Sequence, residues 1–406
     1  MPIRLRMPQI DVPLALAAIG LVVIGLLTVY SATSIPGAHQ GLWVKQLVWA
    51  IVAVGAAALV ASIDHRVYDS AAWPLYGVSL ILLVAVLVFG TSTLGAKRWL
   101  ELGPIKFQPS ELAKIATVLL LARRFDDPKI RLSRWQHWLP AAVIVLVPFA
   151  LVLKEPDLGT ALSFPAILIA MLYWGGMRFR QIVLGLTPAM NAMLFFLTGT
   201  LLWFGGLFLA LLLVFRPRLP ALVALLLLNG AVAWATPHLW SHMHDYQKRR
   251  IETFIDPNND PYGAGYQIIQ SKIAMGSGGV LGKGYLKGTQ KALAFLPMRH
   301  TDFIYSVVGE ELGFLGALTV VLLYVVMILR GYRLAAVARD GFAGLMTIGV
   351  VTALFFTIMV NMLMTVGWAP VTGIPLPFLS YGGTALIVNC VQIGLLQNVA
   401  LRRREY

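Results

Sequence analysis

The sequence contains little charge and almost no cysteine. Charged residues make up 12% of the 406 residues, about half of the ~25% that is usual in globular domains. Hydrophobic residues make up 58%, which leaves too few polar side chains to cover a soluble domain of this size. The composition excludes a soluble enzyme, a disordered chain and a fibre, and it indicates a polytopic membrane protein. The single cysteine, Cys390, excludes an internal disulfide and argues against a cysteine-based metal site.

Acidic residues are scarce as well. The chain has 18 Asp and Glu residues against 32 Lys and Arg residues, a net charge of +14. In a soluble protein this excess would suggest nucleic-acid binding. In a membrane protein, Lys and Arg gather in cytoplasmic loops as topology signals and lie against anionic lipids. We therefore expect membrane lipids, and no nucleic acid, as partners.

Long apolar runs predict an all-α, polytopic transmembrane helical bundle. A helix that crosses a membrane needs ~20 mainly apolar residues. Such runs lie near 12–31, 43–62, 72–90, 110–124, 138–153, 159–176, 304–329, 342–366 and 384–400, and a longer apolar region covers 181–239. Arg216-Pro217-Arg218 interrupts that region with two cations and a helix breaker. One span there gives ten in total, whereas three, near 181–198, 200–215 and 219–239, add a hairpin and give the twelve that we favour.

The positive charges predict the orientation of these spans. With the N-terminus in the cytoplasm, the short cytoplasmic loops carry many more Lys and Arg residues than the short outer loops, as the positive-inside rule requires. Either span count then places both termini in the cytoplasm. The long polar stretch 240–303 falls outside, and no soluble domain is visible. We expect a single membrane domain over residues 1–406 with one large extracytoplasmic loop, 240–303.

Ionisable residues near the ends of the spans are the candidates for chemistry, because such groups are costly in a membrane and usually line a cavity. Glu111 and Lys114 are three apart on one helix face and can pair; a structural ion pair and a cavity-lining role remain equal alternatives. Asp157, in Glu-Pro-Asp-Leu-Gly-Thr, fits a helix N-cap or a functional acid at the outer mouth. Asp302, beside Arg299, is the last acid before an apolar helix, so capping and contact with a lipid headgroup sugar are both open.

Two further patterns lie nearby. Glu310 and Glu311 lie in the helix that follows Asp302, and the sequence does not say which of them faces the cavity. Residues 276–284, Gly-Ser-Gly-Gly-Val-Leu-Gly-Lys-Gly, look like a phosphate loop. The glycine and the Ser or Thr that such a loop needs at fixed positions are missing, so we reject that interpretation.

Several stretches together resemble one family, the SEDS proteins (shape, elongation, division and sporulation). The stretches are QPSELAK, PDLGTAL, DPYGAGYQIIQSKIAMGSGG, FLPMRHTDFIYSVVGEELGFLG and GIPLPFLSYGGTALI. The resemblance runs from about residue 10 to residue 400, and HDYQKRRI, GKGYLKGTQ and RHTDF look more like the elongation members than the division members. The region 181–239 departs from the family, because elongation members have one span there.

The resemblance implies a peptidoglycan glycosyltransferase of the bacterial cell membrane that polymerises lipid II, with a class B penicillin-binding protein as partner. It implies that Asp302 is the catalytic residue, that Glu111 and Lys114 line the central cavity, and that Asp157 is functionally important. Such a reaction needs a base and also cations near the leaving pyrophosphate. The outward-facing candidates for those cations are Lys97, Arg98, Lys272 and Arg299. A divalent cation, Mg or Mn, bridging the pyrophosphate and an acid is plausible chemistry, and no organic cofactor is expected.

Two other functions fit the same composition. A lipid II flippase would also have many spans and intramembrane charges, but its key charges should lie near the bilayer midplane. The acids here cluster at outer helix ends, which favours chemistry at the membrane surface. If the protein were a non-enzymatic scaffold of the cell-wall synthesis complex, the acids at the outer helix ends would have no functional explanation.

Overall fold

The computed structural model describes most of the chain. The described residues are 10–34, 41–93, 96–103, 105–130, 132, 135–198, 209, 212, 214–215, 219–242, 248, 252–256, 260–261, 265–289 and 298–402. The chain divides into two compact units, one made of Met1–Gly175 with Gln267–Tyr406 and the other of Gly176–Tyr266. The single domain over 1–406 stays a prediction.

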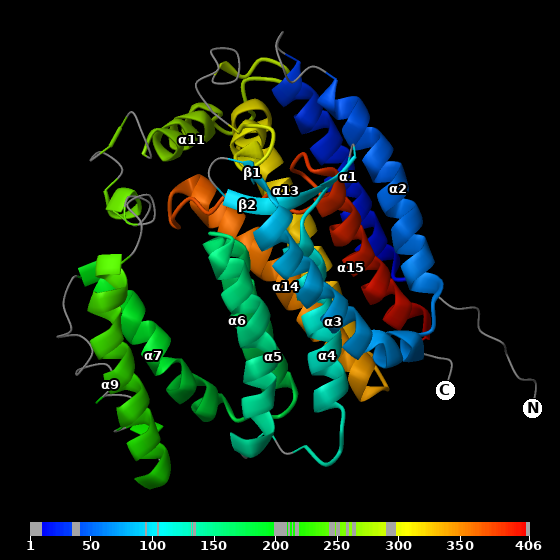
Figure 1. Cartoon of the computed structure of the whole chain (residues 1–406). Helices are drawn as coiled ribbons and strands as arrows, with labels where there is room; N and C mark the ends of the chain where they lie inside the picture. The colour runs from blue at the N-terminus through cyan, green and yellow to red at the C-terminus, as the bar shows by residue number, and fades with distance from the viewer. Residues whose placement is uncertain are drawn as a thin grey trace, which may run out of the picture. The chain divides into compact units, whose positions relative to one another are not determined.

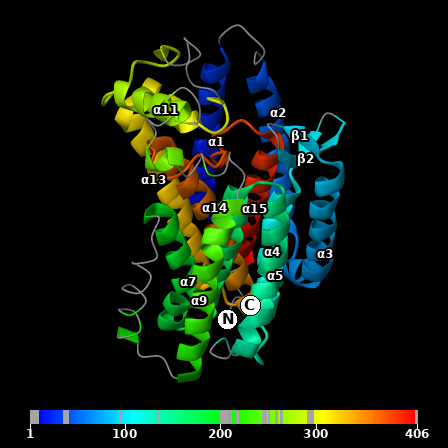
Figure 2. The same cartoon turned by 60° about the vertical axis from the view of Figure 1, so that its left-hand side comes forward.

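The first unit is a helical bundle. Its long helices are α1 (Val12–Thr33), α2 (Leu42–Ser62), α3 (His65–Phe89), α4 (Pro109–Phe125), α5 (Trp135–Lys154), α6 (Leu158–Trp174), α13 (Ile304–Val337), α14 (Gly341–Val366) and α15 (Gly383–Arg402). The shorter α11 (Tyr266–Ser277) lies across the bundle rather than along it (Figures 1 and 2). Helix α14 packs against α4, α6 and α13, and α15 packs against α2. Most of α14 and α15 is buried, so these two helices form the core.

These helices confirm a mostly helical, multi-pass membrane fold, whereas the prediction that the chain is all-α is wrong because of a small β-sheet. Among the described residues, eight helices are long and apolar enough to cross a membrane. The shorter α4 covers the predicted run 110–124, and α6 covers the run 159–176 except for its last two residues. Most of the run 200–215, and Arg216-Pro217-Arg218 with it, lies outside the described residues, so the choice between ten and twelve spans stays a prediction. The extracytoplasmic position of residues 240–303 likewise stays a prediction.

Aspartates begin four helices of the first unit. In each case the carboxylate accepts a hydrogen bond from a backbone N–H of the first turn, as at Asp11, Asp64, Asp157 and Asp340. Such a cap contributes ~1 kcal/mol, because it binds one of the N–H groups that the helix leaves unpaired. Four of the 18 acids of this sequence are therefore used as helix caps.

A three-stranded antiparallel sheet connects α3 to α4. This sheet was not predicted from the sequence. Its strands are β1 (Thr91–Thr93), β2 (Ala96–Leu102) and β3 (Ile105–Phe107), in that order. Strand β2 contacts α3 and α4, and β3 contacts α15, so the sheet lies over the helix ends of the first unit (Figure 1). We call this end of the unit, where α4 begins, the sheet end, and the other, where α3 and α14 begin, the opposite end.

Helix α13 is interrupted at Gly313. This residue has φ 67° and ψ −164°, a conformation open essentially to glycine alone. The break frees backbone groups on both sides, and residues 278–289, here called the clamp loop, bind them. Four backbone hydrogen bonds join the segments: Lys283 N to Glu310 O, Gly284 N to Glu311 O, Phe314 N to Gly279 O and Leu315 N to Val280 O.

The side chains of Glu310 and Glu311 secure the same loop, and both are buried. Oε1 of Glu310 accepts hydrogen bonds from Lys283 Nζ and from Thr289 N, each at 2.8 Å. Oε1 of Glu311 accepts from Ser31 Oγ of α1 at 2.7 Å. Both glutamates therefore face the interior, and the stretch that resembles a phosphate loop completes an interrupted helix.

The second unit contains α7 (Phe179–Thr198) and α9 (Leu219–His242), which pack against each other. Asn191 Nδ2 donates a hydrogen bond to Asn229 Oδ1 at 2.7 Å, and Asn229 Nδ2 donates to Thr187 Oγ1 at 2.9 Å. Buried amide contacts of this kind favour helix pairing in an apolar environment. The two helices cover the predicted runs 181–198 and 219–239.

Gly313→Val is expected to destabilise the fold. A Cβ at this position would lie 2.6 Å from the carbonyl oxygen of Val280, and the backbone conformation alone costs other residues ~1–3 kcal/mol. The variant should melt at a lower temperature and be cleaved faster within the clamp loop under limited proteolysis. Gly55→Ala in α2 is the matched control, since nothing lies within 4 Å of a Cβ there. If Gly313→Val melted at the wild-type temperature, the fold would not depend on the interruption of α13 at this glycine.

Candidate functional site

Asp302 lies at the sheet end, in a turn that immediately precedes α13. The backbone of this turn is fixed, because three successive carbonyl groups accept hydrogen bonds from α14 and from the segment that precedes α15. The bonds are Tyr381 N to His300 O at 2.8 Å, Ser380 Oγ to Thr301 O at 2.6 Å and Asn361 Nδ2 to Asp302 O at 2.9 Å. The turn that carries Asp302 is therefore held rigidly against the core helices.

The side chain of Asp302 is half-buried and lies near Gly373. A Cβ at Gly373, whose φ is +75°, would be 3.5 Å from Oδ2 of Asp302. The N-cap of α13 is Phe303, which makes no side-chain capping bond among the described residues. Asp302 therefore does not occupy the capping position that was the alternative to a functional role.

Asn361 joins the turn of Asp302 to the segment that follows α14. Its side chain is fully buried, and Nδ2 donates to Ile374 O at 2.7 Å as well as to Asp302 O. No feature of the sequence singled out this residue. A lone asparagine in an apolar helix indicates a polar contact, but it does not say with what.

Asp157 is the predicted N-cap of α6, whereas its role as a functional acid stays a prediction. It caps α6 by accepting from Thr160 N at 3.2 Å, and Oδ2 also accepts from Gln108 Nε2 at 3.2 Å. Nη1 of Arg98 lies 3.9 Å from the same Oδ2. The acid thus brings together the start of α4, strand β2 and the start of α6.

The turns of Asp157 and Asp302 meet the same segment. A Cβ at Gly159, in the first turn of α6, would lie 2.6 Å from Cδ1 of Ile374 and 2.8 Å from Cβ of Thr372. Only glycine allows this approach. Residues 372–374 therefore lie between the two acids, with Gly159 packed against them and Gly373 beside Asp302.

The predicted pair of Glu111 and Lys114 is present. Lys114 Nζ lies 2.8 Å from Glu111 Oε1, with side-chain exposures of 4% and 14%. Both residues lie within the first two turns of α4, close behind Gln108. This confirms the ion pair, whereas its role in lining a substrate cavity stays a prediction.

The four predicted cations do not form one cluster. Arg98 contacts the turn that carries Asp157, whereas Lys97 of the same strand is exposed. Nε of Arg299 donates to Ala32 O at the end of α1, and burial lowers the pKa of this guanidinium. Lys272 is exposed on α11 and packs against Gly367 at the end of α14. These cations surround the sheet end rather than converge on one point.

Glu155 is an acid that sequence reasoning missed. It lies in the turn between α5 and α6, outside both helices, and it is fully buried. Neither carboxyl oxygen has a hydrogen-bond partner within the described part of the chain. Burial, and then the charge of Asp157, raise the pKa of Glu155 to about 8, and Arg98 opposes part of this shift. No sequence signal distinguishes this glutamate from an exposed turn residue.

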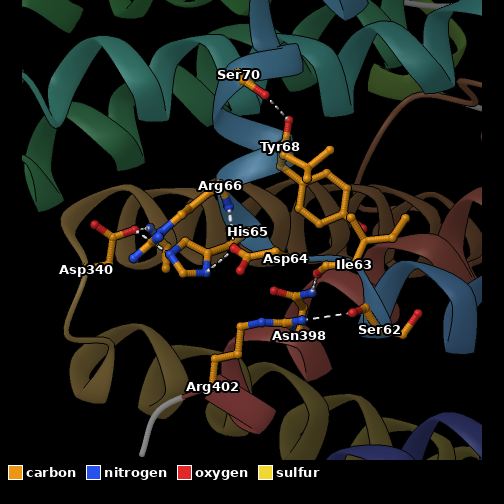
Figure 3. A network of polar contacts seen from close by, with 12 residues as sticks. Ser62, Ile63, Asp64, His65, Arg66, Tyr68, Ser70, Asp340, Asn398 and Arg402 are labelled. Carbon is orange, nitrogen blue, oxygen red and sulfur yellow. Dashed lines mark hydrogen bonds and ion pairs between the residues drawn. The ribbon is translucent and has the colours of Figure 1, made fainter. Parts of the chain in front are cut away.

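A second charged network occupies the opposite end (Figure 3). Here Nδ1 of His65 lies 3.4 Å from Oδ1 of Asp64, and Nε2 of His65 lies 3.4 Å from Oδ2 of Asp340. Arg402 Nη2 donates a hydrogen bond to Ser62 O at 2.8 Å. The network borders a cavity of about 400 Å³. Because Asp64 and Asp340 cap α3 and α14, these contacts tie helix ends together. Among the described residues, no group of three or more His, Cys, Asp or Glu side chains is placed to hold a metal ion.

Comparison with known proteins assigns the family. The model of the family described as "Cell cycle protein", of the FtsW, RodA and SpoVE type, matches residues 9–198 and 197–405. The peptidoglycan glycosyltransferase MrdB of Escherichia coli is 38% identical over 397 residues, which cover 98% of this chain and 95% of MrdB. The probable peptidoglycan glycosyltransferase FtsW of Trichlorobacter lovleyi is 35% identical over 403 residues, covering 97% of this chain and 94% of the relative.

Solved structures agree with this assignment. A chain of a peptidoglycan synthase complex, whose structure concerns the coordination of polymerization and crosslinking, superposes with a TM-score of 0.74 at 31% identity. The alignment covers 98% of this chain and 99% of that one. The rod shape determining protein RodA of Thermus thermophilus superposes with a TM-score of 0.66 at 27% identity, covering 99% of each chain. The chain therefore belongs to the FtsW/RodA family of SEDS proteins.

Proposed function

We propose that this peptidoglycan glycosyltransferase polymerises lipid II at its sheet end, with Asp302 as the general base. The observation that carries the proposal is the position of Asp302. Its carboxylate is half-buried on a turn whose three carbonyls are fixed by Tyr381, Ser380 and Asn361. A base must be held within reach of the proton that it removes, and this turn supplies a fixed support beside the end of the helices.

The reaction that we propose for this site is a single displacement. Asp302 takes the proton of the 4-hydroxyl of the acceptor sugar as that oxygen attacks the anomeric carbon of the donor. The bond from the anomeric carbon to the polyprenyl diphosphate breaks, and the diphosphate leaves with the electron pair. One displacement of this kind inverts the anomeric centre. We propose Arg98, which contacts the turn that carries Asp157, as the cation that stabilises the negative charge developing on the diphosphate. Lys97, Lys272 and Arg299 lie around the same end without converging on one point and remain further candidates.

Three of the predicted residues support this site from the neighbouring helices. Asp157 accepts a hydrogen bond from Gln108 and lies close to the guanidinium of Arg98. Glu111 and Lys114 form their ion pair one turn further along α4. In our proposal the pair lines the cavity in which the substrate headgroup lies. Removing Glu111 would leave Lys114 as an unpaired buried charge, which is strongly destabilising.

A divalent cation, Mg or Mn, would be shared with the substrate. Magnesium commonly binds through one or two carboxylates together with substrate phosphates. The described residues offer no group of three acidic or histidine ligands, which fits a shared ion better than an ion in a protein cage. Asp302 or Asp157 would supply the carboxylate oxygen, and the ion would neutralise charge on the diphosphate.

The partner and the orientation complete the proposal. A class B penicillin-binding protein would crosslink the strands that this chain polymerises, in the bacterial cell membrane with both termini of the chain in the cytoplasm. A structural neighbour comes from a synthase complex in which polymerization and crosslinking are coordinated, which supports such a partner. The flippase and scaffold alternatives receive no comparable support, since the relatives carry glycosyltransferase names.

Asp302→Asn is expected to fold and to polymerise lipid II at least ~100-fold more slowly than wild type, the low end for a lost general base. The amide keeps the shape of the side chain but cannot accept the proton. Glycan product and melting temperature should be measured on one preparation. Asp127→Asn, at an exposed acid of the opposite end, is the matched control. Near wild-type turnover of Asp302→Asn would remove Asp302 from the mechanism.

The orientation predicts which introduced cysteines react with an impermeant thiol reagent added outside the cell. In a background that replaces the buried Cys390, Lys287→Cys of the clamp loop should react. Lys129→Cys, after α4, and Pro217→Cys, outside the described residues, should not. Labelling at Lys129→Cys would contradict the predicted orientation. Labelling at Pro217→Cys without labelling at Lys129→Cys would exclude the twelve-span arrangement.

A further inference from the structure

The cavity at the opposite end takes no part in the proposed reaction. It has a volume of about 400 Å³ and lies where α3 and α14 begin and α15 ends. All three helices are long and apolar enough to cross a membrane, so their ends, and the cavity between them, lie at the depth of lipid headgroups. A cavity of this volume is large enough to hold a small polar ligand or a headgroup.

The lining of this cavity carries charges of both signs. Besides His65 it contains three arginines and three aspartates, namely Arg66, Arg339, Arg402, Asp69, Asp126 and Asp340. The arginines would attract a purely anionic ligand, but the aspartates would repel it, and the reverse holds for a purely cationic ligand. The lining is therefore complementary to a ligand that carries one charge of each sign.

The three aspartates lie close enough together to repel one another. Nε2 of His65 lies 3.4 Å from Oδ2 of Asp340. Nε of Arg123 lies 3.8 Å from Oδ1 of Asp69. Asp126 has no ion-pair partner within the described part of the chain, and burial, followed by the charges of Asp340 and Asp69, raises its pKa. An ammonium group beside Asp126 would relieve this repulsion and would also donate hydrogen bonds to the carboxylates.

Helix α15 supplies two polar side chains to the same cavity, Asn398 and Arg402. Both donate hydrogen bonds to backbone carbonyls at the end of α2, and in Figure 3 they lie below His65 and Arg66. Asn398 is fully buried, yet its Oδ1 has no hydrogen-bond partner within the described part of the chain. An unpartnered buried acceptor is costly, so this oxygen calls for a donor that the described residues do not supply.

We propose that this cavity binds the headgroup of a zwitterionic phospholipid with a primary amine, of the phosphatidylethanolamine class. The ammonium group lies against Asp126 and the neighbouring aspartates. The phosphate lies against the arginines, of which Arg339 is exposed and has no partner within the described residues. The acyl chains lie along α3, whose side chains Val67 and Trp73 are exposed. This lipid site is independent of the reaction proposed for the sheet end.

The selectivity among lipids is the first measurement. Delipidated protein in detergent should be titrated with phosphatidylethanolamine, phosphatidylcholine and phosphatidylglycerol, and the bound lipid counted by native mass spectrometry. All three lipids carry the phosphate, but the trimethylated nitrogen of phosphatidylcholine has no N–H to donate, and phosphatidylglycerol has no cation. Phosphatidylethanolamine should bind about tenfold more tightly than either, the low end for a hydrogen bond to a charged group. Equal affinities for phosphatidylethanolamine and phosphatidylcholine, or tighter binding of phosphatidylglycerol, would overturn the proposal.

Variants of two exposed residues separate the two charges of the headgroup. Asp126→Asn should bind phosphatidylethanolamine about tenfold more weakly and phosphatidylcholine as before, because only the ammonium group loses its partner. Asp127→Asn, at the adjacent exposed acid outside the cavity lining, is the matched control and should keep the wild-type selectivity. Arg339→Gln should weaken the binding of both lipids alike, because both carry the phosphate. If the selectivity persisted in Asp126→Asn, the proposal would be wrong.

Competition with free phosphoethanolamine distinguishes a membrane lipid from a soluble ligand with the same two charges. Phosphoethanolamine lacks acyl chains, whose burial adds to the affinity of a lipid, so it should displace phosphatidylethanolamine only at a concentration about 100-fold higher or more. Displacement at an equal concentration would assign the cavity to a soluble phosphoamine and overturn the assignment to a lipid. If Asp126→Asn does not fold, the wild-type selectivity, this competition and Arg339→Gln still test the proposal.

Discussion

An interrupted helix in an apolar bundle is stable only if the backbone groups that the break releases find partners. In α13 the clamp loop provides them, through hydrogen bonds to the carbonyls of residues 310 and 311 and from the N–H groups of residues 314 and 315. The carboxylates of Glu310 and Glu311 secure the same loop. The part of α13 that precedes Gly313 is therefore a short helix that the clamp loop holds in place. Asp302 lies in the turn directly before this short helix. The clamp loop thus fixes the helix that follows Asp302, and Asn361, Ser380 and Tyr381 fix the turn itself.

The site gains its remaining order from contacts between segments far apart in the sequence. Asn361 binds the carbonyls of Asp302 and Ile374, and the close approach of Gly159 to Ile374 brings in the start of α6. Asp157 then links α6 to β2 and to α4. A rigid support of this kind suits a reaction in which a base and several cations must be held around a diphosphate. Asp157 is held in this arrangement because it also caps α6.

Much of this could be predicted from the sequence, for identifiable reasons. Hydropathy located the helices because an apolar run of that length has few alternatives in a membrane protein. Spacing predicted the Glu111–Lys114 pair, and the position of Asp157 directly before an apolar run predicted its cap. The β-sheet escaped prediction because its strands have three to seven residues, too few for a clear alternation. Asn361, Gly313 and Glu155 escaped because burial and long-range contacts, not local pattern, define them. The catalytic assignment of Asp302 came only from family resemblance.

Photo-crosslinking tests the location of the site most directly. A lipid II analogue with a photoreactive group on its disaccharide should be bound to the protein in membranes, crosslinked, and mapped by peptide sequencing. If the sheet end holds the headgroup around Asp302, adducts should fall within residues 298–303 and 370–376, and unlabelled lipid II should compete for them. Competed adducts confined to the network at the opposite end, around His65 and Asp340, would contradict the account.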